Sequence, residues 1–141
     1  MKKIVIITAM KEELEAIKNK FEKVEEKQLK DLTFFEGQAN GKEYILVKCG
    51  VGKVNAARVT QILIDNFDIE YIINIGIAGS LNDELEIGDI VIGKNLVQHD
   101  FDITAFGHEK GYITDTGRVF QSNENLIKKY SDYIKYPIMM E

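Results

Sequence analysis

The chain has 141 residues, of which 45% are hydrophobic, and this length and composition suit one globular domain with a sizeable core. Its net charge of −5 provides no basic field that would attract nucleic acid or an anionic membrane surface, so neither is expected as a partner. The apolar runs are too short to span a bilayer and the start has no signal-peptide pattern, which predicts a cytoplasmic protein.

The first half of the chain predicts a strand, a helix and a hairpin. The β-branched run Lys2–Thr8 lacks alternation, which is typical of a strand covered on both faces. An amphipathic helix is expected over Lys11–Phe21. The strand-like runs Leu32–Ala39 and Glu43–Lys48 flank Asn40-Gly41, a dipeptide that accepts positive φ at both turn positions and therefore predicts a β-hairpin.

The second half continues the alternation of strands and helices. A helix is expected over Val54–Phe67, a buried strand over Tyr71–Ile77, a further strand over Asp89–Val97 and a last helix over Asn123–Tyr133. Alternating elements of this kind predict an α/β sandwich around a central sheet, with residues 1–141 forming a single domain.

Two glycine-rich turns follow predicted strands. "CGVGKVNAA" fails the phosphate-loop pattern because Val54 follows Lys53, and it fails the dinucleotide pattern because Asn55 stands where the third glycine belongs. A small-ligand turn and a tight turn without a ligand both remain open for this stretch. "NIGIAGSL" repeats the arrangement with Gly76 and Gly79, and open α/β sheets bind ligands at the strand ends where such turns meet.

Two acidic residues stand where the first predicted strand gives way to a helix. Glu12 and Glu13 fit the first turn of any helix, where carboxylates interact favourably with the dipole. Alternatively, one of them holds a water molecule and takes its proton as a general base. Met10 beside them would offer an apolar, polarizable contact to a sugar or a thioether.

A glycine-bounded loop, "HDFDITAFGHEKG", follows the Asp89–Val97 run. Its apolar tips, Ile103 and Phe106, either pack into the chain's own core or close a pocket, including one in a neighbouring subunit. With Cys49 as the only cysteine and two histidines in the chain, no disulfide and no zinc-ligand spacing is present, so no metal is expected.

Five motifs together resemble one family. "AMKEEL", "GVGKVNAA", "INIGIAGSL", "GDIVI" and "HDFDITAFG" occur in the order and spacing of the bacterial 5'-methylthioadenosine/S-adenosylhomocysteine nucleosidases, over nearly the whole chain up to about Phe120. The resemblance implies a nucleoside phosphorylase-like fold, a three-layer α/β sandwich with a central mixed sheet, in a homodimer without a cofactor. It also implies hydrolysis of the N-glycosidic bond of a 5'-thio-substituted nucleoside, with release of adenine.

The same resemblance implies roles for individual residues. Glu13 matches the water-activating glutamate, and the remaining matches are contacts to the substrate. These are Met10 and Val51 at the ribose and alkylthio side, Ile77, Ala78 and Gly79 near the attacking water and the adenine, and Ile103 and Phe106 in the 5'-substituent pocket of a partner subunit. Phosphorolysis is disfavoured, because a phosphate clamp generally uses arginine forks and the chain has only Arg58 and Arg118, neither in a glycine turn.

The chain departs from the family pattern in two ways. Isoleucine at position 77 replaces a residue that is often a small hydroxyl residue. Family members also continue past Glu141 into a segment with the acid that protonates adenine, so the chain is expected to be an incomplete nucleosidase domain, truncated at its C-terminus. No role is assigned to Met140 and Glu141, and Asp100 and Asp102 are not at the position of the missing acid. A futalosine-type hydrolase and a non-catalytic remnant that binds nucleosides or dimerises remain alternatives.

Overall fold

The structure is a computed structural model that describes residues 2–131. The chain divides after Gly79 into two compact units, each with its own sheet. The expectation that residues 1–141 form a single domain stays a prediction.

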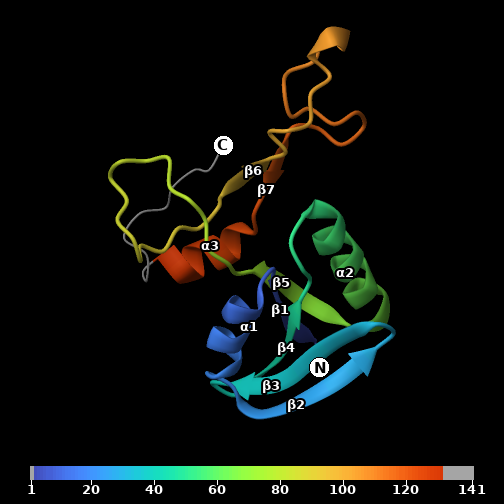
Figure 1. The fold of residues 1–141 in the computed structure, drawn as a ribbon, viewed down its shortest axis with the longest axis vertical. Helices are drawn as coiled ribbons and strands as arrows, with labels where there is room; N and C mark the ends of the chain where they lie inside the picture. The colour runs from blue at the N-terminus through green and yellow to red at the C-terminus, as the bar shows by residue number, and fades with distance from the viewer. Residues whose placement is uncertain (1, 132–141) are drawn as a thin grey trace. The chain divides into compact units, whose positions relative to one another are not determined.

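A five-stranded mixed sheet forms the first unit, in the order β2-β3-β4-β1-β5 (Figure 1). Strand β1 pairs in parallel with β4 on one side and with β5 on the other, while β2, β3 and β4 pair antiparallel. The strands are β1 (Lys3–Thr8), β2 (Glu22–Leu29), β3 (Leu32–Ala39), β4 (Lys42–Lys48) and β5 (Ile69–Asn74).

Two helices cover opposite faces of this sheet and make three layers (Figure 1). On one face, Val59 and Leu63 of α2 (Lys53–Asn66) pack against Val5 and Ile7 of β1. On the other, Leu14 of α1 (Lys11–Lys18) packs against Ile6 and Leu46. Strand β1 is therefore apolar at successive positions because both of its faces are buried, as the sequence predicted.

The predicted hairpin is confirmed. Strands β3 and β4 pair antiparallel across Asn40-Gly41, whose φ values of 49° and 72° are both positive. A dipeptide with both φ values positive matches the right-handed twist of the flanking strands. This turn fixes the register that places Phe34 and Val47 side by side in the core.

The first helix is shorter than predicted and is followed by a strand that the sequence reading missed. Helix α1 ends at Lys18 rather than Phe21, whose ring stacks instead on Tyr44 at 5.3 Å. Strand β2 was missed because its residues are almost all exposed and strongly charged, a pattern that reads as solvated helix surface. Such charge is common on edge strands, where it discourages pairing with other chains.

The end of β5 and the strand after it also differ from expectation. Strand β5 stops at Asn74 instead of Ile77, because beyond the bond from Ile75 N to Ile7 O the next N–H group with a partner, that of Ile77, donates to the Glu13 side chain rather than to a neighbouring strand. In the second unit, only Asn95–Val97 of the predicted Asp89–Val97 strand is paired, as β6. Among residues 2–131 no strand pairs with residues 89–94, and an apolar run without a ladder partner does not form a strand.

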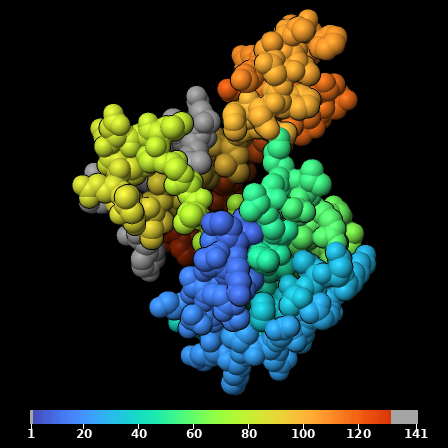
Figure 2. All heavy atoms as spheres, in the orientation of Figure 1, coloured from blue at the N-terminus to red at the C-terminus, as the bar shows by residue number. Residues whose placement is uncertain are grey.

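The second unit consists of a small antiparallel sheet with a long excursion and a helix. Strand β6 pairs with β7 (Val119–Gln121), and the intervening residues 98–118, which we call the arm, carry the short 3-10 helix η1 (Thr104–Phe106). The orange atoms of the arm form one lobe in Figure 2. Helix α3 covers Glu124–Ser131, and the rest of the predicted Asn123–Tyr133 helix lies outside the described residues, as do Met140 and Glu141. None of the described helices is long and apolar enough to cross a membrane.

Substituting Leu63 tests the core beneath α2. This side chain is fully buried, whereas Ile64, the next residue of the same helix, is 52% exposed. We expect Leu63→Ala to lower the free energy of unfolding by about 2–5 kcal/mol, since it leaves a cavity. Ile64→Ala should change it by less than about 0.5 kcal/mol. Urea denaturation followed by circular dichroism measures both, and equal losses would contradict this packing.

Candidate functional site

The carboxyl ends of three parallel strands meet at one edge of the first sheet. Strand β1 leads through Ala9 and Met10 into α1, β4 leads through Cys49 and Gly50 into α2, and β5 leads into an irregular segment, residues 75–80. Backbone hydrogen bonds extend the pairing past the strand ends, because Cys49 N donates to Thr8 O at 2.8 Å and Ile75 N donates to Ile7 O at 3.0 Å. The three segments that follow these strands are therefore held close together.

The Glu13 carboxylate lies at this edge and accepts three backbone hydrogen bonds. Its Oε2 accepts the N–H groups of Ala9 and Met10, each at 2.9 Å, and its Oε1 accepts the N–H of Ile77 at 3.1 Å. The first two bonds are local, since Glu13 is the third residue of α1 and caps the helix start. The third joins residues 64 positions apart and is not needed to cap a helix.

Gly76 lies directly against the same carboxylate. A Cβ at this position would lie 2.9 Å from Glu13 Oε1, 3.3 Å from Cδ and 3.5 Å from Oε2. From the sequence, Gly76 was expected to let the backbone approach a ligand at the sheet edge. Its close neighbour within the described chain is the Glu13 side chain.

The hydrogen bonds determine the charge of the site. The pKa of Glu13 lies below its usual value, mainly because the carboxylate accepts the Met10 N–H. The N–H groups of Ile77 and Ala9 lower the pKa further, whereas partial burial raises it. Glu13 is therefore an anion at neutral pH. Burial raises the pKa of the neighbouring Cys49 thiol, and the negative charge of Glu13 adds to that rise, so the thiol is protonated.

The structure places the other predicted residues of the first unit near this edge with different degrees of contact. Met10 and Ile77 bond to Glu13 through their backbone N–H groups, and the Ile77 side chain is 80% exposed. Val51, 73% exposed, follows β4 just before α2. Ala78 and Gly79 are exposed in the irregular segment after β5, and a Cβ at Gly79 would meet nothing within 4 Å.

The two remaining predicted residues, Ile103 and Phe106, lie on the arm of the second unit. Ile103 precedes η1, and its carbonyl accepts the N–H of Phe106 at 3.0 Å. Phe106 is 82% exposed, so it does not pack into the core of its own unit. The interpretation that both apolar tips pack inside the chain therefore fails for Phe106.

Sequence reasoning missed the backbone donors of the site. It named Met10 and Ile77 for their side chains, and it did not name Ala9. The spacing between Met10 and Glu13 carries the signal for the local pair, because an acidic residue at the third helical position accepts the N–H of the cap residue. The Ile77 donor has no comparable local signal.

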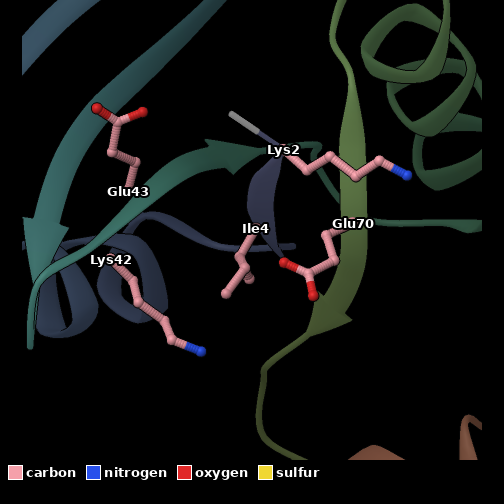
Figure 3. Close-up of a pocket in the computed structure, with 5 residues that line it drawn as sticks. All are labelled: Lys2, Ile4, Lys42, Glu43 and Glu70. Carbon is pink, nitrogen blue, oxygen red and sulfur yellow. The ribbon is translucent and has the colours of Figure 1, made fainter.

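A hollow lies at the opposite end of the sheet from Glu13. It has a volume of about 190 Å³ and is lined by residues at the amino ends of β1, β4 and β5: Lys2, Ile4, Lys42, Glu43 and Glu70. Figure 3 shows their charged groups pointing in different directions. Ligand sites usually measure about 300–1,000 Å³ and carry convergent polar groups, so this small hollow is a weaker candidate than the Glu13 edge, where three N–H groups converge on one carboxylate. Within residues 2–131, no three side chains are grouped as metal ligands.

Residues 3–139 match the model of the Phosphorylase superfamily, and the chain belongs to that family. The fold agrees, since 93% of this chain superposes with a TM-score of 0.88 on one of its solved relatives.

The chain is similar to 5'-methylthioadenosine/S-adenosylhomocysteine nucleosidases, which confirms the resemblance. It is 43% identical over 126 residues to the nucleosidase of Geobacillus sp. (strain WCH70), covering 89% of this chain and 54% of the relative. The nucleosidase of Colwellia psychrerythraea in complex with adenine superposes with a TM-score of 0.88 at 36% identity, covering 93% and 54% of the two chains. A futalosine hydrolase mutant of Helicobacter pylori superposes with a TM-score of 0.83 at 31% identity, covering 100% of this chain and 65% of that chain. The chain thus spans about half the length of the curated relatives it matches.

The lowered pKa of Glu13 predicts an acid-side loss of stability. A carboxyl group with a lower pKa in the folded than in the unfolded state stabilises the fold above its unfolded pKa of about 4.3. That contribution disappears as the pH falls through the folded pKa. We expect the free energy of unfolding to fall more steeply below about pH 4.3 in the wild type than in Glu13→Gln.

Glu12→Gln is the matched control, since exposed Glu12 precedes Glu13 in the same helical turn. It should keep the wild-type slope. Urea denaturation between pH 7 and 3 measures all three proteins. Parallel curves for the wild type and Glu13→Gln would contradict the described hydrogen bonding.

Proposed function

We propose that the protein hydrolyses the N-glycosidic bond of 5'-methylthioadenosine and S-adenosylhomocysteine, releasing adenine, with Glu13 acting on the attacking water. The Glu13 carboxylate at the carboxyl edge of the parallel strands is the observation that carries this proposal. The names of the relatives support the choice of reaction and substrate.

The hydrogen bonds of Glu13 suit this chemistry. Oε2 accepts two N–H groups and Oε1 accepts one, and a carboxylate has about four acceptor positions, so Oε1 can also accept a hydrogen bond from water. Cleavage of a nucleoside passes through a transition state with positive charge on the ribose. An anion held beside it would orient the water, stabilise that charge and take the water's proton.

The topology also favours a ligand at this edge. The chain leaves β1 toward α1 on one face and leaves neighbouring β4 toward α2 on the other, the arrangement at which open α/β sheets bind ligands.

Hydrolysis is favoured over phosphorolysis because both arginines have other partners. Arg58 pairs with Asp31, and Arg118 donates to the Lys110 carbonyl at 3.0 Å.

The proposal includes a cellular setting and an assembly. The reaction would take place in the cytoplasm as a step of methionine salvage, without a cofactor. The protein would act as a homodimer in which Ile103 and Phe106 lie near the substrate site of the partner. The exposure of Phe106 supports this arrangement, because an 82% exposed phenylalanine on a loop is suited to contact a partner or a ligand.

Substituting Glu13 tests the reaction. We expect Glu13→Gln to slow adenine release from methylthioadenosine by about a hundred- to ten-thousand-fold, the usual contribution of a positioned acid or base. Glu12→Gln should stay within about twofold of the wild type, since Glu12 is an exposed neighbour outside the site. Chromatographic detection of adenine, with protein in excess over nucleoside, measures slow as well as fast release.

Three results would count against the proposal. Equal rates for the wild type and Glu13→Gln would remove the role of Glu13. Base release from futalosine but not from methylthioadenosine would favour the futalosine-type alternative, which the Helicobacter pylori relative supports. Adenine binding without any release would favour a non-catalytic nucleoside-binding protein.

Substituting Phe106 tests the proposed partner contact. We expect the wild type to sediment as a dimer and Phe106→Ala to raise KM for methylthioadenosine by about tenfold with little change in kcat, because it removes apolar contact to the 5'-substituent. Leu81→Ala is the control, because Leu81 is a fully exposed apolar residue of the same unit outside the arm. It should change neither KM nor kcat. A monomeric wild type, or an unchanged KM in Phe106→Ala, would contradict this contact.

A further inference from the structure

We infer that Gly76 is a positioning residue, whose missing side chain lets the Glu13 carboxylate reach the Ile77 N–H and so fixes the orientation of Oε1. The inference concerns the geometry of the carboxylate. It rests on the proposed function only for its last step, the effect on adenine release.

The contacts at position 76 are specific to Glu13. The three heavy atoms nearest to a Cβ built on Gly76 all belong to the Glu13 carboxylate, and the shortest distance, 2.9 Å to Oε1, is shorter than real Cβ contacts. The φ of Gly76 lies outside the left-handed region, so the backbone itself accepts alanine. Glycine is therefore needed at this position for the neighbouring carboxylate rather than for a positive φ.

An added Cβ would move the side chain rather than the strand end. Ile75 is held by its N–H bond to the Ile7 carbonyl, whereas the Glu13 carboxylate is the far end of a flexible side chain. Oε2 has two local donors in the turn before α1, so it can stay bound while Oε1 rotates away. The bond that should be lost is the one from Ile77.

Loss of that bond changes the site without removing its charge. Oε1 is the oxygen with room to accept a hydrogen bond from water, and the N–H of Ile77 fixes its direction. Misplacing a reacting group by about 1 Å costs roughly a hundredfold in rate. Gly76 thereby influences the reaction through Glu13, without itself contacting the substrate.

The test combines a spectrum with a rate. In a pH titration followed by amide NMR, the N–H signals of Ala9, Met10 and Ile77 should all shift as Glu13 protonates. In Gly76→Ala, we expect the Ile77 signal to lose this response while Ala9 and Met10 keep it. The midpoint should rise, because a hydrogen bond to the anion is lost. Adenine release should slow by about a hundredfold.

Two further variants control the spectrum. Gly79→Ala places a Cβ in open space in the same loop and should leave the Ile77 titration unchanged. If Gly76→Ala fails to fold, the double variant Glu13→Ala/Gly76→Ala shows whether the contact between the added Cβ and the Glu13 carboxylate is the cause. With the carboxylate removed, the added Cβ no longer meets those three atoms, so the double variant should fold.

The outcomes separate this inference from the proposed function. An Ile77 titration that persists in Gly76→Ala, or a double variant that also fails to fold, overturns the positioning role of Gly76. Loss of the titration with an unchanged rate of adenine release overturns its influence on the reaction. A wild type without adenine release removes the proposed function, whereas the titration still tests the geometry.

Discussion

The Glu13 carboxylate adds a side-chain connection at the sheet edge, beyond the last backbone hydrogen bond between β1 and β5. It binds the segment after β1 through Ala9 and Met10, and it binds the segment after β5 through Ile77. Each bond pairs an anion with an N–H group, and hydrogen bonds to charged groups are stronger than those between neutral groups. One side chain thus fixes the start of α1 relative to the end of β5, and the proposed site is built around that connection.

The structural and chemical demands on Glu13 conflict in one respect. The N–H groups that hold the carboxylate also stabilise its charge, which lowers its pKa and makes it a weaker base. A weak base is sufficient where the electrophile carries most of the reactivity, as a ribosyl cation does. In the proposed reaction, the hydrogen bonding therefore favours a role in orienting water and stabilising positive charge over a role that needs strong basicity.

Sequence patterns predicted the parts of the fold whose signals are local. The burial of β1 on both faces, the Asn40-Gly41 hairpin and the amphipathic α2 all follow from residue type and spacing. Strand β2 was missed because its charges belong to an exposed edge. In the site, Glu13 could be separated from Glu12 by its three-residue spacing from Met10. The Ile77 contact depends on the parallel pairing of β1 with β5, which no local pattern encodes.

The position of β5 explains why the connection through Glu13 matters beyond chemistry. Within the described residues, strand β5 is one of the two edge strands of the first sheet, and edge strands have a neighbour on one side only. Its last ladder bond runs from Ile75 N to Ile7 O, and the next contact that anchors the chain is the bond from Ile77 to Glu13. Gly76 is therefore held on both sides, which keeps a short irregular segment in place. The absence of a side chain at Gly76 makes the second anchor possible, so the geometry of the carboxylate and the order of the strand end depend on each other.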